Sequence, residues 1–331
     1  MSQHPIGIKI SGTGSYLPER ILTNQDLARM VETSDEWIRS RTGIAERRIA
    51  ADNEATSNLG AKAAERALEA AGLEATDLDL IIVATITPDK PFPNTACMVQ
   101  RHIGASRAFC FSLEAACSGF VYMIEVASSL IRTGSAKHAL IIGAEKLSTI
   151  INWEDRTTCV LFGDGAGAAI LSATSPEENM LLASNLGADG TYADILHVPG
   201  GGTALPFSQY VLDHKLNYLQ MSGPEVFKQA VNTMTSAASN VLADAGMTEA
   251  DLTWFIPHQA NTRIISAVAK RLGMDESKAY CNLERYGNTS AATIPIALDE
   301  MVRGGKVAHG DLLLMVAFGG GLTWGANLLR W

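Results

Sequence analysis

The sequence predicts an α/β protein built from two copies of one fold, and an internal repeat is the first observation behind this prediction. The segment AGL at residues 71–73, followed by an acidic turn and the apolar run 80–84, recurs as AGM at residues 245–247, followed by an acidic turn and the apolar run 254–257. The offset is 246 − 72 = 174 residues. Self-similarity over such a distance indicates a duplicated structural unit.

A second set of matches extends the repeat at an offset of 171 residues. It pairs Phe109-Cys110 with Tyr280-Cys281, Arg132 with Arg303, Gly134 with Gly305 and His138 with His309. An insertion or deletion of three residues reconciles the two offsets. Because the matches keep one order in both halves, we expect the halves to share their elements.

Each copy is expected to run helix, glycine stop, acidic turn, buried strand, second helix, strand, third helix, glycine turn and long apolar strand. The strands expected at 80–85, 139–143 and 312–318 are apolar without alternation, as strands covered on both faces are. Helices should therefore cover both faces of the sheets. The polar stretch 172–179 is the candidate boundary, and it divides the chain into halves 1–174 and 175–331.

Composition limits the class of partner. The chain has 331 residues, enough for two units of ordinary size. Charged residues make up 18% and hydrophobic residues 47%, so part of the surface is expected to lie against a second subunit, most simply in a homodimer. Its 26 basic and 35 acidic residues give a net charge of −9, which argues against nucleic-acid binding.

The sequence favours a cytoplasmic protein without membrane contact. Residues 1–9 lack the basic start and apolar core of a signal peptide. The uncharged run 312–329 is interrupted by three consecutive glycines, which suits a buried strand and turn better than a membrane helix. The five cysteines include no Cys-x-x-Cys pair and the histidines are scattered, so we expect reduced thiols and no metal site.

Cys117 is the candidate nucleophile. It lies in LEAACSGF, residues 113–120, directly before a stretch that is compatible with a helix. Backbone N–H groups and the positive end of the helix dipole would favour its thiolate, the form that attacks a carbonyl carbon. Its small neighbours leave room for a substrate. The remaining cysteines are expected to be apolar fillers: Cys97, Cys110, Cys159 and Cys281.

His258 and Asn288 are the candidate partners of Cys117. The repeat predicts that Cys117 and Asn288 are equivalent, because 117 + 171 = 288. His258 follows the buried strand of the second copy. Ligands of open α/β sheets bind beyond the carboxyl ends of strands, so the three side chains are expected to converge between the copies. Taken singly, His258 would suit a cap or a core, and Asn288 a turn.

A thiolate, a neutral imidazole and an amide without a paired acid suit acyl transfer with carbon–carbon bond formation. The sulfur can hold an acyl group, while the imidazole and amide N–H groups donate hydrogen bonds to an oxygen that becomes negative. A decarboxylating thioester would form an enolate that attacks the acyl-cysteine.

Two glycine-rich segments do not indicate a nucleotide site. GTG at residues 12–14 lacks the third glycine and the acidic residue of a dinucleotide loop. GDGAG at residues 163–167 lacks the Lys-Ser/Thr end of a phosphate loop, so tight backbone packing is its expected role.

At these residues the chain resembles β-ketoacyl-acyl-carrier-protein synthase III, a condensing-enzyme family with a thiolase-like fold. The resemblance covers essentially the whole chain, and its motifs are AACSGF at 115–120, GDGAG at 163–167, PHQAN at 257–261, GNT at 287–289 and GGGLTWG at 319–325. It implies two duplicated halves in a five-layered αβαβα sandwich.

The resemblance also implies a reaction. Cys117 would be acylated by a short acyl-CoA such as acetyl-CoA. His258 and Asn288 would promote decarboxylation of malonyl carrier protein and its condensation, which initiates fatty-acid synthesis. The backbone N–H groups of Cys117 and Gly320 would form an oxyanion hole. No cofactor is implied, because acyl-CoA is a substrate.

Binding residues follow from the same resemblance. Residues 35–43 look like a coenzyme A segment, although the pattern alone indicates only an amphipathic helix with surface arginines. Trp37 would stack on adenine, with Arg41 near phosphate and Arg156 as the opposite jaw. Thr33 and Asn261 would contact the pantetheine arm or the nucleotide.

Two further surfaces are implied. Phe92 resembles a residue that crosses a dimer interface to close the partner's acyl pocket, which would also be lined by Leu147, Phe162 and Phe318. An acyl carrier protein is acidic, so a basic face is expected. It would comprise three residues on one face of a helix, with Lys228 as a further contact: Arg263, Lys270 and Arg271.

Three other interpretations stay open. A cysteine-nucleophile hydrolase or thioesterase would use the same cysteine and histidine, with an acid to orient the histidine, where this sequence offers Asn288. A condensing enzyme of secondary metabolism or alkene synthesis would share all three residues and differ in its acceptor. A scaffold dimer would bind carrier protein without turnover.

Overall fold

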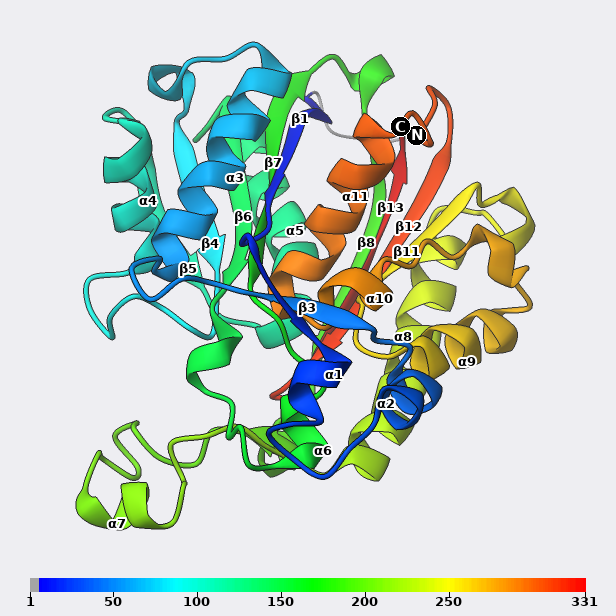
Figure 1. The fold of residues 1–331 in the computed structure, drawn as a ribbon. Coiled ribbons are helices and arrows are strands. Elements are labelled where there is room, and N and C mark those ends of the chain that lie inside the picture. The colour runs from blue at the N-terminus through cyan, green and yellow to red at the C-terminus, as the bar shows by residue number, and fades with distance from the viewer. Residues whose placement is uncertain (1–5) are drawn as a thin grey trace.

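Two mixed β-sheets, one from each half of the chain, form the frame of the protein (Figure 1). The computed structural model describes residues 6–331. The prediction that residues 1–9 are not a signal peptide therefore lies largely outside the described residues. The first sheet has the order β1 (Gly7–Tyr16), β7 (Gly165–Thr174), β6 (His138–Glu145), β4 (Leu80–Ala84) and β5 (Phe109–Leu113). The second has the order β8 (Leu181–Ala188), β13 (Thr323–Arg330), β12 (Leu312–Gly319) and β11 (Trp254–Pro257).

The strand directions confirm the duplication. In the first sheet, β7 pairs antiparallel with β1 and with β6. Strand β4 pairs parallel with β6 and with β5. In the second sheet β8, β13 and β12 are antiparallel in turn, and β12 and β11 are parallel. Strands β8, β13, β12 and β11 therefore correspond to β1, β7, β6 and β4. The division at 174/175 stays a prediction.

Helices separate and cover the sheets, which makes the five predicted layers (Figure 1). Helices α3 (Thr56–Ala71) and α4 (Thr95–Ile103) cover the outer face of the first sheet. Helices α8 (Gly223–Asp244) and α9 (Thr262–Leu272) lie outside the second sheet. Helices α5 (Gly119–Arg132) and α11 (Thr293–Arg303) lie between the sheets and contact both. All five residues of β4 are buried, as the unbroken apolar run predicts.

Short elements connect this frame and surround the site. They are β2 (Arg20–Thr23), α1 (Asn24–Leu27), α2 (Asp35–Thr42), β3 (Glu46–Ile49), η2 (Ala116–Ser118), α6 (Arg156–Cys159), β9 (Leu196–His197), α7 (Gln209–Asp213), β10 (Gln220–Met221), α10 (Leu283–Tyr286) and η8 (Ser290–Ala292).

The predicted equivalence of Cys117 and Asn288 is wrong. Turns η2 and η8 directly precede the equivalent helices α5 and α11, and each begins with a residue in the left-handed region, Ala116 at φ 45° and Ser290 at φ 51°. Since 290 − 116 = 174, the equivalent of Cys117 is Ala291. Beyond these helices the offset becomes 171, because α11 has 11 residues and α5 has 14. This explains the match of Arg132 with Arg303, but not that of Phe109 with Tyr280, which precedes both helices.

One expected strand of the second copy is also missing. The counterpart of β5 is a single bridge between Phe255 and Ala279, with Tyr280 N donating to Phe255 O at 2.8 Å. The Gln259 side chain takes the next backbone groups: it donates to Tyr280 O at 3.0 Å and accepts from Asn282 N at 3.2 Å. The Gln259 side chain thus makes the hydrogen bonds that a neighbouring strand would make in a full β-ladder.

The GDGAG segment has the predicted packing role. A Cβ at Gly167 would lie 2.7 Å from Ile296 N on α11, so only glycine allows β7 to approach this helix so closely. The GTG segment behaves alike, since a Cβ at Gly14 would lie 2.3 Å from Ala63 O on α3.

Candidate active site

A cavity of about 1460 Å³ lies beside the 3-10 turns η2 and η8 and the end of β12. Cys117, His258 and Asn288 all line it, so the predicted convergence of these three residues is found. Each is less than a tenth exposed. The convergence arises without the symmetry that was used to predict it.

Cys117 lies in η2, directly before α5, at the predicted helix start. A Cβ at Gly319 would lie 2.6 Å from Cys117 N, so the end of β12 runs against the backbone of the nucleophile. Gly320, next along the chain, lines the same cavity. The two backbone N–H groups predicted to stabilise an oxyanion therefore come from adjacent segments.

Burial acts on the Cys117 thiol in the direction opposite to that expected from the helix start, which stays a prediction. Burial raises the pKa of the Cys117 thiol to about 12, and the charge of Glu145 raises it further, against a lowering contribution from Ser290. Desolvation is the largest cause of this rise, because low-dielectric surroundings penalise the charged form. Cys117 is therefore a thiol at rest and has to lose its proton during acyl transfer.

His258 follows β11 and is held by its backbone N, which donates to Val316 O at 2.8 Å. Burial lowers the pKa of its imidazole to about 3, so the ring is neutral at physiological pH. Its Nδ1 lies 2.7 Å from the Thr293 hydroxyl, which donates to Ser290 O at 3.0 Å. When Thr293 donates to Nδ1, the proton of the imidazole is on Nε2.

Asn288 is clamped on both sides. Its N donates to Leu161 O at 2.8 Å, and its O accepts from Gly163 N at 3.0 Å. Its side-chain Oδ1 accepts from Ser290 N at 2.8 Å. The acceptor end of the amide is therefore engaged, and the Nδ2 donor is the end that can serve a ligand.

Sequence reasoning missed three residues here. Thr293 contacts His258, and Ser290 contacts Asn288 and Thr293. Glu145 is fully buried beside them, and burial raises the pKa of its carboxyl to about 7. Of these three residues, only Ser290 could have been found from the sequence, because it lies in the GNTS segment with Asn288. Nothing in the chain spacing links Glu145 or Thr293 to the site.

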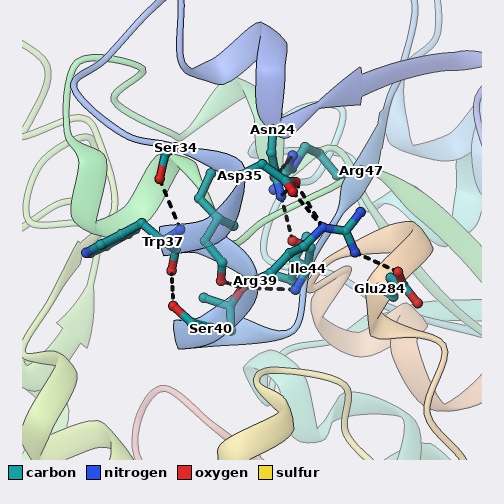
Figure 2. Close-up of polar contacts among 11 residues, drawn as sticks. Asn24, Ser34, Asp35, Trp37, Arg39, Ser40, Ile44, Arg47 and Glu284 are labelled. Carbon is teal, nitrogen blue, oxygen red and sulfur yellow. Dashed lines mark hydrogen bonds and ion pairs between the residues drawn. The ribbon is translucent and has the colours of Figure 1, made fainter.

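Helix α2 carries two of the predicted coenzyme A residues and is anchored by its opposite face (Figure 2). Asp35 accepts from Asn24 Nδ2 at 2.8 Å, and Asn24 Oδ1 accepts from the buried Arg47 at 2.9 Å. Arg39 pairs with Asp35 at 2.9 Å and with Glu284 of α10 at 2.7 Å. The ring of Trp37 points away from this network (Figure 2).

Trp37, Arg41 and Asn261 all line the cavity. The Arg156 guanidinium lies 5.0 Å from the centre of the Trp37 ring and that of Arg41 lies 5.8 Å from it, both in cation–π range. Asn261 caps α9 and donates to Arg41 O at 3.1 Å, which fixes α9 against α2. Thr33 and Arg156 are not cavity-lining; the Thr33 hydroxyl is buried and without a partner in residues 6–331.

Three of the four predicted acyl-pocket residues line the cavity: Leu147, Phe162 and Phe318. Phe92 does not, and its side chain is 86% exposed. This exposure is compatible with its expected place against a partner subunit.

The predicted basic residues lie on the outer helices. Arg263, Lys270 and Arg271 belong to α9 and Lys228 to α8, and all four are exposed. Helices α8 and α9 contact each other, and Arg271 donates to Asn232 of α8 at 2.5 Å. Arg263 also lines the cavity, so this basic face reaches its mouth.

Three further observations concern metal sites, disulfides and membrane spans. In residues 6–331, no group of three or more His, Cys, Asp and Glu side chains is placed to hold a metal ion. The five cysteines are free. Among the described helices, none combines the length and hydrophobicity that crossing a membrane needs.

Fold and site together define a class: a thiolase-like protein with a cysteine, a histidine and an asparagine at one cavity. Comparisons with known proteins agree. The family model for 3-oxoacyl-[acyl-carrier-protein (ACP)] synthase III matches residues 111–190, and the model for the C-terminal part of that family matches residues 242–331. The chain therefore belongs to the β-ketoacyl-[acyl-carrier-protein] synthase III family of condensing acyltransferases.

Individual relatives support this assignment. The chain is 53% identical over 326 residues to a β-ketoacyl-[acyl-carrier-protein] synthase III of Caldanaerobacter subterraneus, with 98% of each chain covered. The crystal structure of 3-oxoacyl-[acyl-carrier-protein] synthase III from Aquifex aeolicus matches with a TM-score of 0.91 at 49% identity, covering 98% of this chain and all of that one. A priming β-ketosynthase of a polyketide pathway matches with a TM-score of 0.91 at 36% identity, covering 100% and 98%.

Proposed function

We propose that this protein condenses a short acyl-CoA, with acetyl-CoA as the first candidate, with malonyl-ACP to initiate fatty-acid synthesis. The observation that carries the proposal is the convergence of the Cys117 thiol, the neutral His258 imidazole and the Asn288 amide in one cavity, with all three side chains buried. The contact of His258 Nδ1 with the Thr293 hydroxyl disfavours a hydrolase, which would place an acid there.

In the first half-reaction, the Cys117 sulfur attacks the thioester carbonyl of acyl-CoA. The backbone N–H groups of Cys117 and Gly320 stabilise the negative oxygen of the tetrahedral intermediate. Coenzyme A leaves, and the acyl group stays on the sulfur.

In the second half-reaction, malonyl-ACP loses CO₂ and becomes an enolate. His258 Nε2–H and Asn288 Nδ2–H donate hydrogen bonds to its oxygen. This requires the Thr293 hydroxyl to turn away from Ser290 O, to which it donates in the structure, and to donate to His258 Nδ1 instead. The enolate carbon attacks the acyl-cysteine, and Cys117 leaves as a thiolate. These steps need no metal or cofactor, because the cysteine and the two donors supply the chemistry.

The binding sites belong to the same proposal. Thr33, Trp37, Arg41, Arg156 and Asn261 bind coenzyme A, supported by the cation–π contacts at Trp37. The short acyl chain lies against Leu147, Phe162 and Phe318. The basic face of Lys228, Arg263, Lys270 and Arg271 binds the acidic carrier protein.

A homodimer completes the proposal. Strand β5 is at the edge of its sheet and only half-buried although its sequence is FCFSL, and Phe92 is exposed. An exposed apolar edge strand favours pairing with another chain. Phe92 would then close the acyl pocket of the second copy. The halves 1–174 and 175–331, each contributing to one cavity, stay part of the proposal.

Mass spectrometry after mixing with acetyl-CoA tests the proposal. Condensation predicts stable acetylation of the peptide that contains Cys117, and loss of the acetyl group only when malonyl-ACP is added. Cys117→Ser should not be acetylated, whereas Cys281→Ser, which removes an exposed thiol, should behave as wild type. Hydrolytic loss without malonyl-ACP would indicate a thioesterase, and no adduct would indicate a scaffold. Turnover with an acceptor other than malonyl-ACP would indicate a condensing enzyme of secondary metabolism.

A further inference from the structure

Two cysteines lie in contact with each other outside the active site. Cys97 is in the first turn of α4 and Cys110 is in β5, and Cys110 Sγ donates to Cys97 Sγ at 3.4 Å. Both thiols are free, and both side chains are only half-buried, so a small solute can reach them. Neither residue lines the cavity, and the proposed reaction gives them no role.

Hydrogen bonds on both sides of the pair hold α4 against β5. On one side of the two sulfurs, Ala96 N donates to Ser112 Oγ at 3.4 Å. On the other side, Gln100 Nε2 donates to Ala108 O at 2.7 Å. Because helix and strand are tied before and after the two cysteines, the contact between the sulfurs follows from the fold of both elements.

The Cys110 side chain points toward α4 and not toward the free edge of the sheet. Alternation along β5 places Cys110 on one face of the strand and Phe111 on the other. Cys110 packs with the core under α3 and α4, whereas Phe111 packs with the core between the two sheets. A second copy that pairs with β5 would use the backbone edge of this strand, so the contact between the two sulfurs would remain within one chain.

The pair lies behind one wall of the active-site cavity. Asn94 caps α4, and its side-chain oxygen accepts from Cys97 N at 3.1 Å. Ser112, two residues after Cys110 in β5, accepts from α4 on the same side. Asn94 and Ser112 both line the cavity. A covalent link between the two sulfurs would therefore tie together the two elements that form this wall.

The geometry at rest is close to that of a disulfide. The sulfurs of a disulfide are about 2.05 Å apart, so the two thiols have to approach by roughly 1.3 Å. Rotation of the two side chains about their Cα–Cβ bonds can supply this approach. Burial, and then the contact with Cys97, raises the pKa of the Cys110 thiol to about 11. Cys110 is therefore a thiol at rest and loses its proton only as the new bond forms.

We propose that Cys97 and Cys110 form a redox-active dithiol that a peroxide converts to an intrachain disulfide; this inference is independent of the proposed function. One sulfur attacks the O–O bond of hydrogen peroxide and becomes a sulfenic acid, and the released hydroxide takes the proton of that thiol to form water. The second sulfur attacks the sulfenic sulfur, the S–S bond forms, and the hydroxyl group leaves as water with the proton of the second thiol. The two thiols lose two electrons, and the peroxide is reduced to two molecules of water.

Peptide mapping after treatment with hydrogen peroxide tests this proposal. The full-length protein is oxidised, its remaining thiols are blocked with iodoacetamide in denaturant, and the chain is cleaved after Lys, Arg and Glu. This digestion leaves Cys97 in peptide 75–101, Cys110 in 108–114 and Cys117 in 115–125, so the three thiols are read separately. The expected product is 75–101 joined to 108–114 and lighter than the two reduced peptides together by two hydrogen atoms. Dithiothreitol should restore both thiols, because a disulfide is reducible and a sulfinic acid is not.

Single substitutions supply the controls. Cys97→Ser and Cys110→Ser should each lose the linked peptide, because one of the two sulfurs is missing. Cys281→Ser is the matched control, since it removes an exposed thiol elsewhere in the chain and should form the bridge as wild type does. Cys117→Ser should also form the bridge, because the pair lies outside the cavity.

Three results would overturn the proposal. The first is alkylation of both Cys97 and Cys110 after oxidation, which would show that contact between the two thiols does not lead to a bond. The second is a bridge from either residue to Cys117, and the third is a disulfide-linked dimer on a non-reducing gel through Cys110. The outcome does not depend on acyl transfer, so a failure here leaves the proposed function standing, and a failure of acetylation leaves the dithiol standing.

Discussion

His258 should make the stability of the folded protein depend on pH in a way that a single substitution removes. Burial lowers the pKa of its imidazole from 6.5 to about 3. The unfolded chain therefore binds a proton at His258 below pH 6.5, whereas the folded chain does not until about pH 3. The stabilising contribution of the neutral ring is complete above pH 6.5 and is lost as the pH falls toward 3.

The magnitude follows from the difference between the two pKa values. One unit of pKa corresponds to about 1.4 kcal/mol. Between pH 7.5 and pH 5, protonation of His258 lowers the free energy of the unfolded state by the equivalent of about 1.5 pKa units. The free energy of the folded state is almost unchanged, because its imidazole stays neutral over this range. His258 alone should therefore remove about 2 kcal/mol of folding free energy at pH 5, and about 1 kcal/mol at pH 6.

Urea unfolding of wild type and His258→Gln at pH 7.5, 6 and 5 measures this effect. Glutamine retains a side-chain N–H donor but does not titrate in this range. Other groups, including Glu145, titrate in both proteins, so their contributions cancel in the difference between the two free energies of unfolding. The advantage of wild type over the variant should shrink by about 2 kcal/mol from pH 7.5 to pH 5.

Parallel pH dependences in the two proteins would refute this reasoning. They would mean that His258 has an ordinary pKa in the folded state, and hence that the imidazole is solvated or paired with an acid. The interpretation of His258 as a neutral donor to the enolate would then lose its physical basis.

Three other outcomes are expected. Cys117→Ser should form no acyl-enzyme from acetyl-CoA, because a serine hydroxyl is harder to deprotonate than a thiol and a weaker nucleophile; condensation at the wild-type rate, followed by product chromatography, would remove the nucleophile assignment. Trp37→Ala should raise KM for acetyl-CoA roughly tenfold with little change in kcat, and leave KM for acetyl-pantetheine unchanged, since the latter lacks the adenine that Trp37 would stack on. Arg271→Glu should raise KM for malonyl-ACP several-fold, less so at high salt, and should not alter the rate with malonyl-CoA; equal effects on both donors would argue against a carrier-protein contact.

Hydrophobic runs predicted the frame of the fold well, because strands covered on both faces leave an unmistakable pattern. The strands expected at 80–85, 139–143 and 312–318 are found as β4 (Leu80–Ala84), β6 (His138–Glu145) and β12 (Leu312–Gly319). The missing strand near Tyr280 could not be predicted in this way. Its ladder partners are replaced by the side chain of Gln259, which depends on how two distant segments lie in space.

The convergence of Cys117, His258 and Asn288 was predictable because each follows the carboxyl end of a strand, or of a strand's counterpart, in one of the two sheets. The true equivalent of Cys117, which is Ala291, was not predictable, since a local change in helix length shifts the offset between copies without a visible mark in the sequence. The contacts of Thr293 with His258, and the place of Glu145, join residues whose spacing along the chain follows no helical or strand period.

The pKa of Cys117 shows why local sequence context misleads at such a site. A helix start lowers the pKa of a thiol through a dipole that acts over one turn, and the sequence reports this feature directly. Burial depends on every segment that closes the cavity, and it raises the pKa of Cys117 while it lowers that of His258. Both shifts favour the neutral side chain, so the site at rest holds little charge near the reacting atoms. A thiolate or an enolate formed there is stabilised by groups already in place: the backbone N–H groups at Cys117 and Gly320, the neutral His258 imidazole and the Asn288 amide. Burial of the Cys117, His258 and Asn288 side chains limits the contact of water with the reacting atoms, which would slow protonation of an enolate formed there.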